Sequence, residues 1–275
     1  MTSGIRVTHT VRAILHPRPQ DPIARVTDPA ERRGIIVELV IVGVLTFVFS
    51  ALSAALSLIE AQLSGGIGST TVALNPSQSA LGWIDFTRQM MSAARLFAIG
   101  ALGAYLLWRS GIGLDRVGLG RWATRRDVPA GLGLAALIGL PGLGLVAVAR
   151  ALGLNAHLVP SDVDGVWWRW LVLILIAIGN AAAEEIVVVA YFITRLRQLG
   201  ASENGSLVSS AVLRGGYHLY QGVGAGVGNI VMGLVFGRFF QITNRVWPLV
   251  IAHSVMDIVA FVGYALLRNH LGWVG

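Results

Sequence analysis

The sequence predicts an all-α fold, a polytopic membrane helix bundle of about seven transmembrane helices with a cytoplasmic N-terminus. Hydrophobic residues make up 55% of the 275 residues, and the mean hydropathy is +0.69. Charged residues make up only 13%, against about 25% in soluble domains. The chain has no cysteine, which excludes disulfides and Cys-based metal or redox chemistry.

The N-terminal segment, residues 1–33, is polar and rich in Arg and Pro. No apolar stretch follows Met1, so we expect no cleaved signal peptide here. We expect instead a flexible, basic cytoplasmic tail.

Seven apolar stretches follow, taken here in chain order as candidate spans. They cover residues 34–58, 90–108, 129–151, 168–193, 206–220, 225–242 and 246–267. The fifth is short and rich in Gly, so it is either broken or packed deep within the bundle. We expect the first three to be scaffold, with frequent Gly allowing close helix contact.

Arginine placement predicts the orientation of the bundle. Arg residues gather in the N-terminal tail and in the loops after the second, fourth and sixth spans, whereas the opposite loops are poorer in Arg. We therefore expect a multi-pass protein of the cell membrane, in a bacterium the inner (cytoplasmic) membrane. The net charge of +7 indicates contact with anionic membrane lipids and no nucleic-acid partner.

Two charged residues interrupt the scaffold spans. Glu38 lies near the cytoplasmic end of the first span, where it can reach the interface. Arg95 lies near the outer end of the second span, where it either extends to the interface or pairs with a carboxylate.

Two adjacent carboxylates, Glu184 and Glu185, lie inside the fourth apolar span. A charge in such a stretch costs several kcal/mol, of order 2.5–3.5 on insertion scales, and is usually retained for function. Adjacent helical positions point about 100° apart. We therefore expect one glutamate to face a cavity and the other to face a neighbouring helix.

Two further ionisable pairs occur in later spans, each with the i, i+4 spacing that places both residues on one helix face. Arg214 precedes His218 by one turn, and a buried Arg requires an anion, for which Glu184 or Glu185 is the obvious partner. His253 precedes Asp257. Asp257 would accept from one ring nitrogen and fix the tautomer, leaving the other nitrogen for substrate.

A zinc centre is the alternative use of these side chains. His218, His253 and a glutamate could supply the ligands of a catalytic site. The sequence has no His-Glu-x-x-His motif, and the two histidines come from separate spans. We therefore expect no metal and no other cofactor.

The order of these motifs resembles the CPBP (Abi, CAAX-type) family of intramembrane glutamic endopeptidases over about residues 165–265. The family's Glu-Glu-x-x-x-Arg motif is matched by Glu184 and Glu185, but Val189 replaces its Arg. His218 matches the His of Phe-x-x-x-His, but Arg214 replaces its Phe. His253 and Asp257 match the third motif. We interpret the two departures as one exchange, in which Arg214 pairs with Glu185.

The resemblance implies a division into residues 34–160 as N-terminal scaffold and residues 161–275 as the catalytic helices. It implies that Glu184 is a general base that activates water together with His218, while His253 and Asp257 support the oxyanion or orient the substrate. The implied partner is a peptide or membrane-protein substrate; the sequence does not indicate an oligomeric state. Two alternatives remain: a non-catalytic scaffold or immunity protein of the same fold, and a proton-coupled transporter.

Overall fold

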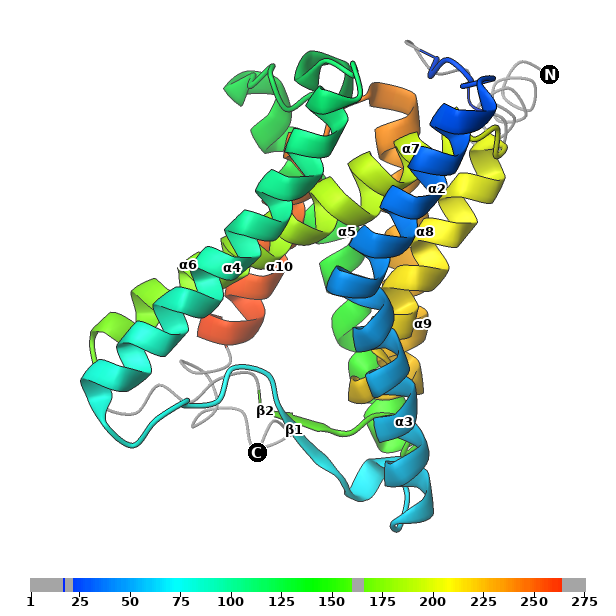
Figure 1. Ribbon diagram of the computed structural model, residues 1–275. Helices are drawn as coiled ribbons and strands as arrows, with labels where there is room; N and C mark the ends of the chain where they lie inside the picture. The colour runs from blue at the N-terminus through cyan, green and yellow to red at the C-terminus, as the bar shows by residue number, and fades with distance from the viewer. Residues whose placement is uncertain (1–16, 18–21, 160–165, 264–275) are drawn as a thin grey trace, which may run out of the picture.

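The computed structural model describes residue 17, residues 22–159 and residues 166–263 (Figure 1). It confirms the predicted all-α membrane bundle, with only two short strands in this part of the chain. Most of the predicted tail (residues 1–16 and 18–21) and the end of the last predicted span (264–267) lie outside the described residues.

The N-terminal half contains the first three predicted spans and a pair of strands. The first span is one continuous apolar rod made of α2, the π-helical segment η1 and α3. The elements are α2 (Pro29–Gly43), η1 (Val44–Val48), α3 (Phe49–Leu63), η2 (Ile67–Ser69), β1 (Thr71–Ala73), α4 (Gly82–Arg109), η3 (Leu114–Val117), α5 (Thr124–Ala151) and β2 (His157–Val159).

The C-terminal half contains the remaining predicted spans. The fourth span runs without interruption through α6, the π-helical segment η4 and α7. The elements are α6 (Trp168–Glu184), η4 (Glu185–Tyr191), α7 (Phe192–Gln198), α8 (Glu203–Tyr217), η5 (Leu219–Gln221), α9 (Val223–Thr243), α10 (Trp247–Ile258) and η6 (Val259–Gly263).

Five helical segments in the described residues are long and apolar enough to cross a membrane. They correspond to the first, second, third, fourth and sixth predicted spans. The seventh is the shorter apolar helix Trp247–Gly263. The fifth, α8, has 15 residues and packs along α9, which agrees with the expectation of a short helix buried in the bundle.

Small residues bring these helices together, as expected for packing in lipid. A Cβ added at Gly100 of α4 would lie 3.2 Å from backbone atoms of Ala182 in α6. A Cβ added at Gly233 of α9 would lie 2.8 Å from Cα of Ala211 in α8. Both distances are shorter than ordinary van der Waals contact, so the backbones of each helix pair approach closely.

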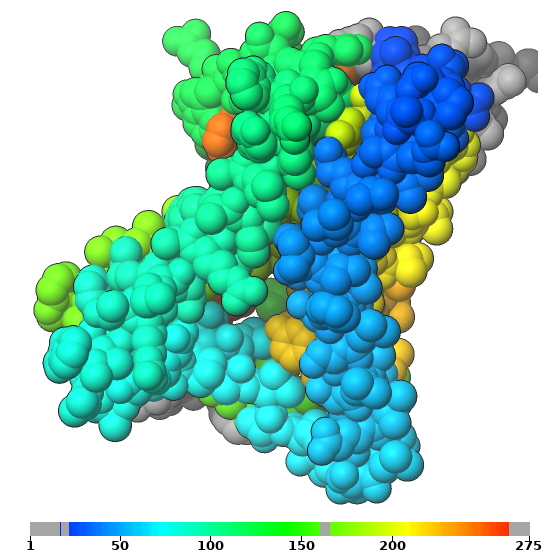
Figure 2. Space-filling view, in the orientation of Figure 1, coloured from blue at the N-terminus to red at the C-terminus, as the bar shows by residue number. Residues whose placement is uncertain are grey.

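The helices meet at the end of the bundle that carries α7 and the start of α2, and they diverge toward the end that carries the strands (Figure 1). There the parallel pair β1 and β2 joins the loop before α4 to the loop before α6. The space-filling view shows a hollow between α3 and α4 on the face drawn (Figure 2). The divergence of the helices opens the interior of the bundle from this side.

Candidate active site

A large cavity occupies the space between the diverging helices. Its volume is about 2000 Å³, and its wall includes residues of η1, α3, α4, α5, α6, α8, α9 and α10. The wall is mostly apolar, but it also carries a polar group. This group contains Glu184, His218, His253 and Asp257, so four of the six predicted site residues line one cavity.

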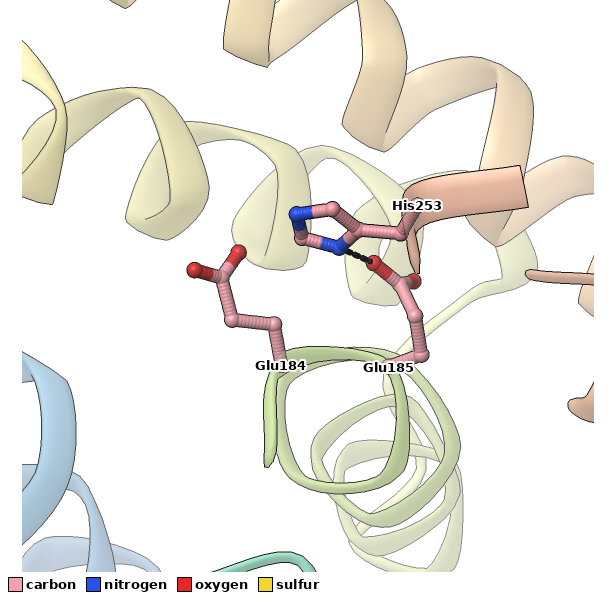
Figure 3. A group of neighbouring side chains, drawn as sticks. All are labelled: Glu184, Glu185 and His253. Atoms are coloured by element: carbon pink, nitrogen blue, oxygen red, sulfur yellow. Dashed lines mark hydrogen bonds and ion pairs between the residues drawn. The ribbon is translucent and has the colours of Figure 1, made fainter. Parts of the chain in front are cut away.

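Glu184 and Glu185 have different environments, as the sequence predicted. Glu184 lies on the cavity wall, and its Oε2 accepts a hydrogen bond from Tyr217 Oη at 2.7 Å. Glu185 is fully buried and does not contribute to the wall. The side chains leave the helix in different directions, and the His253 imidazole lies between their carboxylates (Figure 3). Glu185 begins the π-helical segment η4, a local geometry often found at functional sites.

Arg214 pairs with Glu185, as predicted. Its Nη2 donates to Glu185 Oε1 at 2.5 Å and lies 3.9 Å from Glu184 Oε2. Both Arg214 and Glu185 are 0% exposed. The position that holds an Arg in the resembled family, Val189, is also fully buried. A guanidinium from α8 therefore neutralises the buried glutamate in place of one from the same helix.

The predicted role of Asp257 in fixing the His253 tautomer is wrong. The Nδ1 atom of His253 lies 2.7 Å from Glu185 Oε1, so Glu185 is the hydrogen-bond partner that orients the ring (Figure 3). Asp257 lies on the other side, 3.6 Å from Nε2, and its Oδ2 accepts from Asn180 Nδ2 at 3.0 Å. The i, i+4 spacing placed both residues on one face, but Glu185 from another helix approaches more closely.

His218 is the C-cap residue that follows the last residue of α8, and it lines the cavity. Its Nδ1 lies 2.9 Å from the backbone oxygen of Arg214. A carbonyl oxygen only accepts hydrogen bonds, so Nδ1 carries the proton in this contact. In the neutral ring Nε2 is then a proton acceptor.

Three residues of the site offer the donor atoms of a metal centre. Single ligand atoms of Glu184, Glu185 and His253 all lie within 4.8 Å of one another. However, Glu185 Oε1 is already bound by Arg214 and by His253 Nδ1. A metal ion bound through Glu185 Oε1 would have to displace both contacts, whereas one bound through Glu185 Oε2, a buried atom with no hydrogen-bond partner among the described residues, would not.

Sequence reasoning missed Tyr217 and Asn180 as members of the site. Tyr217 is buried, bonds to Glu184 and packs against the Phe47 ring at a centroid distance of 4.9 Å. Asn180 lies one turn before Glu184, which is the signal that could have indicated a shared face.

The two scaffold charges differ from expectation. Glu38 does not simply reach the interface: its Oε1 accepts from Arg195 Nη2 at 2.6 Å and from Tyr191 Oη at 2.8 Å. Arg95 is not near a helix end, because α4 begins at Gly82 rather than near residue 90. It lies in the middle of α4 and lines the cavity.

Comparison with known families agrees with this site. Residues 166–259, about a third of the chain, match the family described as "Type II CAAX prenyl endopeptidase Rce1-like". This segment is of the Rce1-like family. The matched segment covers α6 to α10 and includes every residue of the polar group. The assignment agrees with the CAAX-type resemblance and supports a protease-type function in general terms. No curated protein and no solved structure matches the chain.

Proposed function

We propose that this protein is an intramembrane endopeptidase that hydrolyses a peptide bond with a water molecule activated by Glu184 and His218. The observation that carries the proposal is the placement of Glu184 on the wall of a large cavity within the bundle, beside two histidines from separate helices. The family match favours a protease over the transporter alternative.

The chemistry requires a base, a stabiliser for the developing oxyanion and a proton for the leaving amine. Glu184 takes a proton from water while the oxygen adds to the peptide carbonyl carbon. When the carbon–nitrogen bond breaks, the same proton passes to the leaving nitrogen. The products are a carboxylic acid and an amine, which exchange a proton to give a carboxylate and an ammonium ion, and Glu184 is a free carboxylate again.

His218 belongs to the same polar group as Glu184, and its Nε2 is free to accept a hydrogen bond. In this scheme His218 therefore contacts the same water molecule as Glu184 and assists the deprotonation of that water. His253, held by Glu185 through Nδ1–H, is doubly protonated in this scheme, so Nε2 also carries a proton and donates a hydrogen bond to the oxyanion. Asp257, 3.6 Å from Nε2, stabilises this charged form of the ring. Glu185 and Arg214 touch neither water nor substrate in this scheme. They hold the His253 ring and keep the buried end of the site electrically neutral.

The buried Arg214–Glu185 pair argues against a non-catalytic protein of the same fold. Val189 alone suggests loss of a supporting arginine. Arg214 supplies that guanidinium from α8, 2.5 Å from Glu185. The support for His253 is therefore present, and the departure from the family motif leaves the site complete.

The site also suits an apolar substrate. The description of the matching family names a CAAX prenyl endopeptidase, and the cavity wall is mostly apolar. Residues of α3 and α4 line the same cavity as Glu184, and the surface is hollowed between these two helices (Figure 2). We propose a peptide or membrane-protein substrate that enters from the bilayer.

The test uses the purified full-length protein in detergent and a mixture of synthetic apolar peptides, with cleavage followed by mass spectrometry. Loss of a general base typically lowers a rate by about 10²–10⁴-fold, so Glu184→Gln should lose cleavage to that extent. Glu60→Gln is the matched control, because Glu60 is an exposed carboxylate on α3 outside the cavity. Cleavage by Glu184→Gln at the wild-type rate, or no cleavage by the wild-type protein, would contradict the proposal.

A further inference from the structure

The cavity that contains Glu184 extends toward one end of the bundle in the part of the chain that the structure describes. Along each of the long helices its wall stops partway, and the last wall residues toward α7 are Thr46, Ile99, Leu132, Glu184, Val235 and His253. From there the wall continues toward the strands, as far as Asn75 in the loop before α4 and Arg150 at the end of α5. Glu184 therefore lies at one limit of the cavity, and the space for a substrate lies on its strand side.

The other end of the bundle is filled by packed side chains. None of the residues 100–131, 185–216 and 236–252, all of which the structure describes, contributes to the cavity wall. These ranges hold much of the main buried apolar cluster, including Leu107, Val189, Ile193, Phe236 and Leu249. Protein interiors packed in this way contain few voids larger than a water molecule. Through the described residues, a peptide therefore has no path to Glu184 from the α7 end.

Arginine placement indicates which end of the bundle faces the cytoplasm. Exposed arginines gather at the α7 end, near the start of α2 and between the end of α4 and the start of α5: Arg25, Arg33, Arg109, Arg121, Arg125 and Arg126. At the strand end the exposed arginines among the described residues are Arg88 and Arg150, and Arg169 there is paired with Asp85 at 2.8 Å. Loops rich in Arg stay on the cytoplasmic side of a membrane. The α7 end is therefore cytoplasmic, and the cavity opens toward the opposite side.

Exposed tryptophans mark the two membrane interfaces. Trp83 and Trp167 lie at the strand end, where α4 and α6 begin, and Trp108 and Trp122 lie at the α7 end. Trp is enriched at both interfaces of a bilayer. The helix between Trp83 and Trp108 is about 37 Å long at 1.5 Å per residue, enough to cross a hydrocarbon core of about 30 Å. Glu184 lies about 24 Å along the axis from the start of α6, so it is deep in the membrane.

We propose that the substrate reaches Glu184 from the non-cytoplasmic side of the membrane, and that it is an extended segment of a membrane-associated polypeptide exposed on that side. This inference rests on the proposed hydrolase function. The description of the matching family names no side of the membrane, and the wall residues of α3, α4 and α5 lie outside the matched segment.

The depth of Glu184 sets a requirement on the length of this segment. An extended chain advances about 3.3–3.6 Å per residue, so about seven residues are needed to cover about 24 Å. Lipid offers no hydrogen bonds to such a backbone, but the cavity wall includes polar side chains, among them Asn75, Gln78, Gln89, Ser92 and Asn229. We therefore expect cuts at least about seven residues from the nearest folded domain on the non-cytoplasmic side.

The first test measures access to the cavity and does not require cleavage. The protein has no cysteine, so a single introduced thiol reports on one position without background. Ser92→Cys and Asn229→Cys place a thiol in the cavity wall, on α4 and α9. Ser64→Cys marks the strand end and Ala30→Cys marks the α7 end, because both residues are exposed there. Each full-length variant is treated with a charged, membrane-impermeant maleimide in sealed right-side-out and inverted membrane vesicles.

The thiols at the cavity wall and at the strand end should react in right-side-out vesicles and remain unlabelled in inverted ones, whereas Ala30→Cys should show the reverse. Labelling after addition of SDS confirms that each thiol is present and reactive. One-sided labelling of either cavity variant is sufficient support, so the result does not depend on one replacement. Labelling of a cavity thiol or of Ser64→Cys in inverted vesicles would overturn the inference. So would two cavity thiols that react in neither preparation, because no aqueous path would then reach the site.

The second test maps new N-termini that depend on Glu184 onto the topology of the proteins that contain them. They should lie in segments on the non-cytoplasmic side, and Glu184→Gln should remove them. New N-termini confined to cytoplasmic segments would overturn this inference and leave the hydrolase proposal intact. One-sided labelling of the cavity without any Glu184-dependent N-termini would contradict the hydrolase proposal and the substrate assigned here, while the direction of access would stand.

Discussion

Replacing Arg214 with Met should destabilise the fold by about 3–5 kcal/mol, the cost of leaving one charge of a buried ion pair without its partner. The pair is 2.5 Å long, and both side chains are 0% exposed. Met keeps most of the volume of the Arg stem, so the effect comes mainly from Glu185, which loses its cation. Water cannot reach Glu185 to compensate.

The double replacement Arg214→Met with Glu185→Gln should recover most of this loss. It removes the uncompensated charge, and replacing both members of a buried pair is often close to neutral. Gln retains an oxygen that can accept from His253 Nδ1. The single Glu185→Gln protein should also be destabilised, because it leaves the guanidinium with only the more distant carboxylate of Glu184, at 3.9 Å.

Unfolding can be measured in mixed micelles titrated with SDS, using the fluorescence of the 8 Trp residues. Arg109→Met is the matched control; because Arg109 is exposed, it should change stability by less than about 0.5 kcal/mol. A change below about 1 kcal/mol for Arg214→Met would refute the reasoning. So would a double variant no more stable than the single one.

Three further predictions concern the same site. A protein with the arginine returned to η4, as Val189→Arg with Arg214→Phe, should unfold at higher SDS than Arg214→Phe alone if the two positions are exchangeable; an equal or lower midpoint would contradict the exchange. Tyr217→Phe removes the hydrogen bond to Glu184 and should lower kcat about 10–100-fold with the fold intact by circular dichroism, since a hydrogen bond to a charged group contributes about 1.5–3 kcal/mol; an unchanged kcat would exclude a role for the hydroxyl. Excess 1,10-phenanthroline or EDTA should leave the cleavage rate unchanged, and inhibition reversed by zinc would establish a metal mechanism.

Much of the fold could be predicted because each span needs its own continuous apolar stretch, and such stretches are visible without tertiary information. The start of α4 could not be placed, because Asp85 and Arg88 interrupt its apolar pattern. Asp85 is neutralised by Arg169 of α6, at 2.8 Å, a contact that the local sequence does not indicate. Arg95 was consequently placed too close to a helix end.

The candidate site, like the fold, could be predicted in part. The pairing of Arg214 with Glu185 followed from the requirement that a buried charge has an opposite charge nearby. The partner of His253 did not follow, because sequence spacing favours Asp257 and only the packing of α10 on α6 brings Glu185 to Nδ1. The need of a buried charge for an opposite charge is thus visible in the sequence, whereas the choice between two candidate partners depends on how the helices pack.

The central claim is that Glu184 makes this protein a peptidase, and N-terminal proteomics of membranes tests it most directly. Cells producing the wild-type protein are compared with cells producing the same amount of Glu184→Gln protein. We predict a set of new N-termini, from membrane-associated proteins or peptides, that is present with the wild-type protein and absent with the variant. The same set of N-termini in both membranes would contradict the account.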